Sequence, residues 1–170
     1  MNLDEALEFL LSHQPLPADR ELNEVTIQKY DEVRRFFLAK PDVACIRPFL
    51  GSFGEGDGLG VYQLVGDVFR RLPRTAVVDA LAESLMSRCR SVCYWSAQLA
   101  AEFPSAELVR PLLGLLKVDD YDLKYAALTA LEQSGSSAVV HEIEEFLSRE
   151  NDNELRELAQ EVVESLEGRI

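Results

Sequence analysis

The sequence holds few of the residues that catalysis and metal binding usually need. Among its 170 residues there are only two histidines, His13 and His141, and they are far apart in the chain. A catalytic site needs a nucleophile, a base and a stabilising group that converge, and the sequence offers no such set. One His-Glu pair, at 141–142, cannot build a two-metal centre. We therefore predict no enzymatic activity, no metal and no cofactor.

Cysteine is also scarce. Cys45, Cys89 and Cys93 are odd in number and lack CxxC spacing, which predicts reduced thiols that pack in the interior. No stretch approaches the ~20 apolar residues that a bilayer crossing needs. The first residues, MNLDE, lack the basic start of a signal peptide. We expect a cytoplasmic protein without a membrane partner.

Basic residues are outnumbered by acidic ones. The chain has 17 lysines and arginines against 30 aspartates and glutamates, and its formal net charge is −13. Such a surface repels phosphate backbones and speeds encounter with basic partners. The one positive stretch, with five arginines between positions 70 and 90, falls mostly at expected helix ends, where arginine complements the helix dipole. We predict a basic protein partner and no nucleic acid; the alternative is that the acidity serves solubility alone.

Glycine is concentrated in one stretch, Gly51–Gly60 (GSFGEGDGLG). A phosphate-binding loop would follow a strand and end in GK[ST]. This stretch instead follows an expected helix and carries Glu55 and Asp57, which repel phosphate. We predict a flexible loop within a repeat, free to touch a partner.

The sequence does contain a repeat. Five segments align with spacings of 31, 31, 31 and 32 positions, and they are Tyr30–Leu38, Val61–Phe69, Val92–Ala100, Leu123–Leu131 and Leu155–Val163. Within each segment positions +0, +3, +7 and +8 are almost entirely apolar, which is one stripe of a 3.6-residue helix. Partner helices are expected near residues 43–53, 75–87, 106–117 and 137–148. Each unit is then a helix hairpin whose apolar face is buried by its neighbours.

The beginning of the chain falls outside this period. Leucines at positions 3, 7, 10 and 11 predict a short amphipathic helix, which prolines at 15 and 17 terminate. We therefore predict an N-terminal capping segment, residues 1–24, followed by a repeat solenoid, residues 25–170, in one domain overall.

The clearest unit lies in residues 105–135, and its most specific part is the run Asp122–Leu131 (DLKYAALTAL). This unit resembles the short HEAT repeat also found in phycobilisome-lyase-type proteins, and the resemblance covers roughly residues 25–168. It implies an all-α fold, a right-handed α-α superhelix of about five helix hairpins with an N-terminal capping helix.

The resemblance also assigns the faces of the helices. In HEAT-like solenoids the second helix of each hairpin lines the concave surface, so positions +2 and +6 are expected to face a groove. With Trp95 at +3, the predicted partner-binding set is Glu32, Phe36, Gln63, Asp67, Tyr94, Trp95, Gln98, Tyr125, Thr129, Glu157 and Glu161. Central aromatic residues flanked by carboxylates are typical of protein interfaces. For Trp95 the alternative is packing between repeats.

The C-terminal segment is a second candidate surface. Residues 141–170 hold ten carboxylates against three arginines, Arg149, Arg156 and Arg169. A basic partner could dock there, and the alternative is a solvated capping face.

The charge and the repeat together suggest a role. Short HEAT-like domains occur among bacterial immunity proteins, which are often small and acidic because they mask the basic surface of a nuclease toxin, and this chain is similar to them. An immunity or inhibitor protein is therefore the leading hypothesis. The alternatives are an assembly adaptor or regulatory scaffold, and a bilin-lyase-like protein that handles a small molecule.

Overall fold

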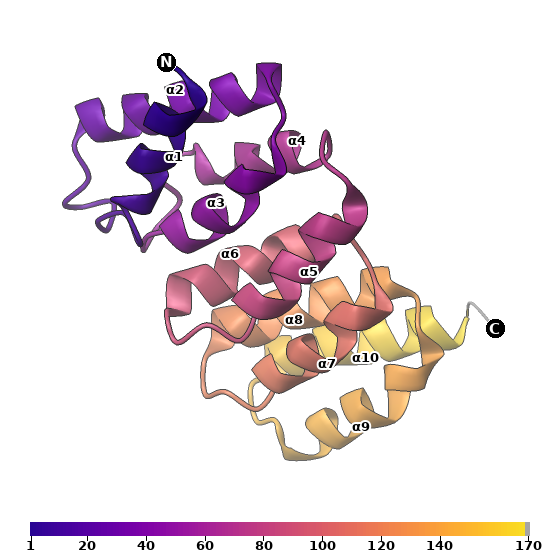
Figure 1. The fold of residues 1–170 in the computed structure, drawn as a ribbon. Coiled ribbons are helices and arrows are strands. Elements are labelled where there is room, and N and C mark those ends of the chain that lie inside the picture. The colour runs from indigo at the N-terminus through magenta and orange to yellow at the C-terminus, as the bar shows by residue number, and fades with distance from the viewer. Residues whose placement is uncertain (169–170) are drawn as a thin grey trace. The chain divides into compact units, whose positions relative to one another are not determined.

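The structure of the protein, a computed structural model, describes residues 1–168 (Figure 1). All regular secondary structure in this part of the chain is helical, so the predicted all-α class is confirmed. The chain divides into two compact units with a boundary between Ser96 and Ala97. We call them unit 1 and unit 2.

Unit 1 contains short helices joined by several loops. Its elements are α1 (Leu3–Leu11), α2 (Glu24–Ala39), η1 (Val43–Cys45), α3 (Ile46–Ser52), η2 (Tyr62–Leu64), α4 (Val65–Phe69), α5 (Arg74–Ser84) and the first part of α6 (Arg90–Ala100). Helix α1 packs against α2 and α3, α2 packs against α4, and α3 packs against α5 (Figure 1). The predicted N-terminal helix is therefore present and contacts the first hairpin. Whether 1–24 and 25–170 are separate segments of one domain stays a prediction.

Aromatic side chains fill the interior of unit 1. Tyr30, Phe49 and Tyr62 are fully buried. The Tyr30 ring meets Phe49 and Tyr62 edge to face, with centroids 5.7 and 5.6 Å away. The hydroxyl of Ser52 donates a hydrogen bond of 3.1 Å to the Tyr30 hydroxyl oxygen. Edge-to-face pairs contribute about 0.5–1.5 kcal/mol each beyond the area they bury, so this cluster is a main source of stability in unit 1.

The glycine-rich loop is tied to the N-terminal segment through one carboxylate. Asp19 accepts hydrogen bonds from the backbone amides of Asp57 and Gly58, at 2.9 and 3.0 Å. Gly58 has a φ of 60°, and the next residue, Leu59, has a φ of 51°. A left-handed backbone suits glycine and strains leucine, so the loop adopts a conformation that these contacts must hold.

Two aromatic side chains hold the same loop from the other side. The indole N–H of Trp95 donates to the Gly56 carbonyl at 3.0 Å, and the Tyr62 hydroxyl accepts from the Gly54 amide at 3.1 Å. The prediction of a flexible loop is therefore wrong. Glycine content indicated freedom of the backbone, but hydrogen bonds from distant residues fix it.

The segment predicted as one helix at 61–69 also differs. It starts as the 3₁₀ turn η2 and becomes α4 only at Val65. The backbone amides of Val61 and Tyr62 donate hydrogen bonds to the loop carbonyls of Gly58 and Asp57. These two amides therefore belong to the loop and not to a regular α-helix. Leu64, expected in the apolar stripe, is consequently 38% exposed.

Unit 2 is more regular and consists of two helix hairpins. Its elements are α7 (Ala106–Leu115), α8 (Tyr121–Ser134), η3 (Ser137–Val139), α9 (Val140–Arg149) and α10 (Asn153–Glu167), with the end of α6 before them. Helix α8 packs against α7 and α10, and α10 also packs against α9 (Figure 1). Asp120 and Asp152 cap α8 and α10, because their side chains accept hydrogen bonds from the backbone amides of Leu123 and Leu155.

The predicted apolar stripe is the buried side of α8 and α10. In α8 all four repeat positions are buried, and in α10 three are buried and Leu158 is half-buried; the buried ones are Leu123, Ala126, Ala130, Leu131, Leu155, Val162 and Val163. The helix-hairpin repeat is thus confirmed in this unit. Within residues 1–168, no helix combines the length and the apolar character needed to cross a membrane.

Candidate functional site

The predicted partner-binding residues lie at the surface of their own units. None of the eleven is buried; the more exposed are Glu32, Gln63, Asp67, Gln98, Tyr125, Glu157 and Glu161, and the half-buried are Phe36, Tyr94, Trp95 and Thr129. Positions +2 and +6 therefore do point away from the apolar stripe. That they bind a partner stays a prediction.

In unit 1 the polar members of this set are engaged by nearby residues. Glu32 pairs with Lys29 at 3.0 Å, and Asp67 forms an ion pair with Arg70. The Gln63 amide donates to the Gly60 carbonyl at 3.2 Å. A partner would have to compete with these contacts, so they offer less to a ligand than their exposure suggests.

The aromatic members in unit 1 are partly used in packing. The Trp95 ring lies 5.7 Å from Phe53 and 5.6 Å from Tyr62, measured between centroids, and its N–H is bonded to the loop. Tyr94 stacks edge-on against Trp95 at 5.5 Å, and Phe36 lies under the Lys40 ammonium. These contacts favour the packing alternative for Trp95 within unit 1.

In unit 2 four predicted residues of α8 and α10 share a surface with two that the predicted partner-binding set lacked, whereas the fifth, Gln98, lies on α6. Tyr121 begins α8, one turn before Tyr125, and its hydroxyl donates a hydrogen bond of 2.6 Å to Glu154 of α10. The centroids of the Tyr121 and Tyr125 rings are 6.0 Å apart, and the two side chains are 41% and 44% exposed. Tyr121 occupies the same helical stripe as Tyr125, so extending the repeat positions by one turn would have found it.

We call this surface the aromatic–acidic face. It consists of Tyr121, Tyr125 and Thr129 on α8 and of Glu154, Glu157 and Glu161 on α10. Both helices begin at the contact between Tyr121 and Glu154 and pack against each other. The residues of each set are spaced by three or four positions, so each set follows one side of its helix.

The electrostatic field at this face is negative. Glu154 accepts the hydrogen bond from Tyr121 and thereby raises the pKa of Tyr121 to about 12; the charges of Glu154 and Asp152 add to this effect. A phenol that resists losing its proton reports nearby negative charge. Glu157 and Glu161 have no counter-ion among the described residues.

Comparison with known protein families identifies the kind of repeat. The sequence pattern of HEAT repeats matches residues 74–164, which run from the start of α5 into α10. The chain belongs to the HEAT-repeat family. The predicted HEAT-like fold is thereby confirmed, and HEAT repeats generally mediate protein–protein interaction. No curated protein matches this HEAT-repeat chain.

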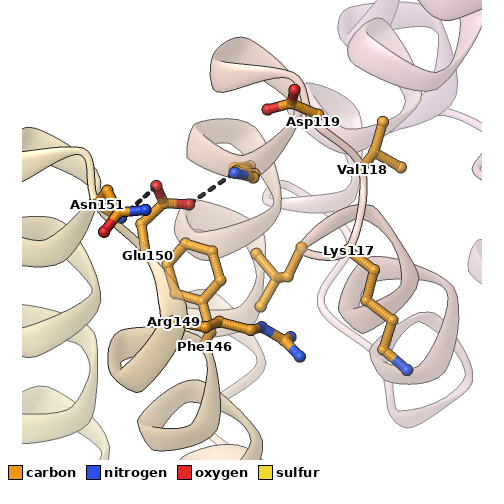
Figure 2. A pocket seen from close by; sticks show the side chains of 9 residues that line it. Lys117, Val118, Asp119, Phe146, Arg149, Glu150 and Asn151 are labelled. Atoms are coloured by element: carbon orange, nitrogen blue, oxygen red, sulfur yellow. Dashed lines mark hydrogen bonds and ion pairs between the residues drawn. The ribbon is translucent and has the colours of Figure 1, made fainter.

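A pocket of about 480 Å³ lies in this HEAT-repeat unit where the α7–α8 connection meets the end of α9, and Lys124 of α8 lines it. Figure 2 shows Glu150 bonded to the backbone beside Asn151, and its other oxygen accepts from Lys124 at 2.6 Å. The Lys124 ammonium also lies 5.9 Å from the Phe146 ring centroid. Hydrogen bonds from the Asp152 amide, the Lys124 ammonium and the Asn151 amide, in this order, hold the pKa of Glu150 below its usual range. The pair is nearly buried, so it fixes the connection between two helices of this unit.

The basic residues of unit 2 that the structure describes contact groups other than the carboxylates of the aromatic–acidic face. Arg156 donates to the carbonyls of Leu147 and Glu150. Three others line a neighbouring pocket of about 540 Å³ with Glu142 and Glu145, and they are Arg110, Lys117 and Arg149. In Figure 2 the Lys117 and Arg149 side chains extend away from Glu150. Within residues 97–168, Lys124 and Arg156 are thus hydrogen-bonded to Glu150 and Leu147, and the other three basic residues line the second pocket.

The acidic C-terminal segment is exposed along α9 and α10. Glu142, Glu144 and Glu145 face solvent on α9, and Glu164 does so on α10. Arg169, counted in this segment, lies outside the described residues. That a basic partner docks on this segment stays a prediction.

The burial of the three cysteines agrees only partly with the prediction that all of them pack in the interior. Cys45 and Cys93 are buried, whereas Cys89 is half-buried and contacts the Ser91 hydroxyl at 3.2 Å. Burial raises the pKa of Cys45 to about 12 and also raises that of Cys93, which disfavours the thiolate needed for nucleophilic chemistry. The prediction that all three thiols pack in the interior is therefore wrong for Cys89, which lies just before α6 and is only half-buried. Residues 1–168 contain no group of three or more His, Cys, Asp or Glu side chains able to hold a metal ion.

Proposed function

We propose that this HEAT-repeat protein is a non-catalytic module that binds a basic protein surface through the aromatic–acidic face. Its biological role is that of an immunity or inhibitor protein, which masks a partner such as a nuclease toxin.

One observation carries the proposal: two exposed tyrosines stand beside a row of carboxylates that has no cation of its own among the described residues. Exposed aromatic side chains are the commonest anchors of protein interfaces. Unpaired carboxylates around such anchors attract positive charge and disfavour acidic partners. A HEAT-repeat scaffold holds both on helices, so little ordering is needed when the partner arrives.

A comparison of three bait proteins in a native lysate tests the proposal. The baits are the wild type, the double variant Tyr121→Ala/Tyr125→Ala, and the control Met86→Ala, which removes an exposed apolar side chain of unit 1 outside the predicted set. We expect the wild type and the control to enrich the same basic protein, and the double variant to recover at least about tenfold less of it. Equal recovery by the double variant would exclude the aromatic–acidic face, and an acidic partner would exclude the charge argument.

Assays of the captured protein separate the immunity role from that of a general adaptor. An immunity protein abolishes the partner's nuclease or other toxic activity when the two are mixed in equal amounts, and an adaptor leaves activity in place. Binding should weaken as salt is raised, because the attraction between exposed charges is screened. For the lyase-like alternative, a change in the absorption spectrum of an added bilin would be the decisive result.

A further inference from the structure

The aromatic–acidic face has a geometry that distinguishes between the two kinds of basic side chain. The Tyr121 and Tyr125 rings are inclined by 30° with centroids 6.0 Å apart, and both are exposed. Two exposed rings one turn apart offer neighbouring π surfaces to a ligand. No cation of unit 2 covers them among the described residues, since the Lys124 ammonium lies at Phe146 and is bonded to Glu150.

A carboxylate is fixed at the edge of these π surfaces. The Tyr121 hydroxyl donates to Oε2 of Glu154 at 2.6 Å, so the carboxylate and the ring keep one relative position. The second oxygen of Glu154 is left to accept from a ligand. Glu157 lies three residues further along α10, on the same side of the helix. The face therefore presents two neighbouring aromatic rings with hydrogen-bond acceptors at their border.

Such an arrangement fits a guanidinium better than an ammonium. A guanidinium is planar, stacks on aromatic rings and presents donors at its edge that can bond a carboxylate in the same plane. A lysine ammonium is a compact, strongly hydrated charge, and it gains the Coulomb attraction without the stacking. We propose that the aromatic–acidic face selects arginine over lysine in the basic segment of its partner. The inference rests on the proposed function and names the side chain that the partner must supply.

Matched peptides test this selection. One synthetic peptide carries arginines at every basic position and the second carries lysines at the same positions, with equal length and charge; a third carries glutamines there. Titration calorimetry at low salt measures each against the wild type. We expect the arginine peptide to bind about five- to tenfold more tightly than the lysine peptide, and the glutamine peptide to bind least.

Variants assign the preference to the two structural elements. Tyr125→Leu keeps an apolar side chain and loses one of the two rings, so the preference for the arginine peptide over the lysine peptide should shrink. Glu154→Gln should weaken both peptides but the arginine peptide more, and Tyr94→Leu in unit 1 should preserve the wild-type ratio. Circular dichroism checks that each variant is folded, which we expect because these side chains are exposed or half-exposed.

The outcomes separate the two proposals. Equal affinity for the arginine and lysine peptides in the wild type overturns arginine selection and leaves the binding of basic surfaces intact. An undiminished preference for arginine in Tyr125→Leu also overturns it, because the Tyr125 ring would then have no part in the selection. If neither basic peptide binds better than the glutamine peptide, the aromatic–acidic face does not recognise positive charge, and the proposed function fails with it.

Discussion

Unit 1 and unit 2 share a helix-hairpin repeat but differ in charge and in core. Unit 1 has 14 acidic and 11 basic residues, whereas residues 97–168 have 16 acidic and 5 basic. The interior of unit 1 contains Tyr30, Phe49 and Tyr62, and that of α8 in unit 2 contains alanines and leucines. The comparison shows that the repeat length sets the positions of the helices along the chain. The core residues then decide how each unit packs, and the surface charges decide which partners it attracts.

The difference in core predicts different sensitivities, and the largest is expected in unit 1. Tyr62→Ala removes a ring that contacts three other aromatic residues and leaves the Gly54 amide without its acceptor. We expect a loss of about 3–5 kcal/mol in the free energy of unfolding, measured by urea denaturation followed by circular dichroism. Tyr62→Phe keeps the ring and should cost only about 1–2 kcal/mol; equal losses would show that the hydrogen bond, not the aromatic cluster, matters.

Unit 2 should instead be sensitive to added volume. Ala127 is fully buried in α8, where small side chains allow helices to pack closely. Ala127→Leu should lower the free energy of unfolding by about 1–3 kcal/mol, because the extra carbons force neighbouring side chains from their preferred positions. The control is Ala138→Leu, at an exposed position of η3, which should change stability by less than about 0.5 kcal/mol. A tolerated Ala127→Leu would contradict the close packing of α8.

The smallest expected effect concerns the ion pair between Lys124 and Glu150. Lys124→Met leaves one oxygen of a nearly buried carboxylate without its donor, and we expect a loss of about 1–2 kcal/mol at neutral pH. Adding Glu150→Gln to this variant should restore part of the loss, since no unpaired charge remains. A double variant less stable than both single variants would show that Lys124 and Glu150 do not stabilise the fold through their ion pair.

The same pair predicts a dependence on pH. The pKa of Glu150 is lowered in the folded protein, so its carboxylate stabilises the fold above the pKa of the unfolded chain. This contribution is lost as the pH falls through the lower, folded value. The difference in stability between the wild type and Glu150→Gln should therefore be largest near neutral pH and disappear in acid. A difference that grows in acid would have the wrong sign.

The regular half of the fold could be predicted from the sequence, and the irregular part could not. Apolar residues at the repeat positions, alanine and leucine in α8 and leucine and valine in α10, predict both helices because the stripe alone determines which side is buried. The order of the glycine-rich loop depends on Asp19 and Trp95, which lie 38 to 39 positions away from the amides and carbonyl that they bond. Contacts of that range leave no periodic signal.

The candidate site shows the same limit. Helical spacing placed Tyr125, Thr129, Glu157 and Glu161 at the surface, but no spacing within one helix could show that Tyr121 reaches Glu154. That bond joins two helices, and it depends on how α8 and α10 pack. The sequence therefore predicted the chemistry of the face and missed the contact that orders it.

The position of Trp95 has a practical consequence. It is the single tryptophan in the chain, and its indole bonds the glycine-rich loop while its ring packs on Phe53 and Tyr62. Its emission spectrum is therefore a built-in optical probe of the loop. Release of the indole into water should shift that emission to longer wavelength, so loop opening can be followed in real time without attaching a dye.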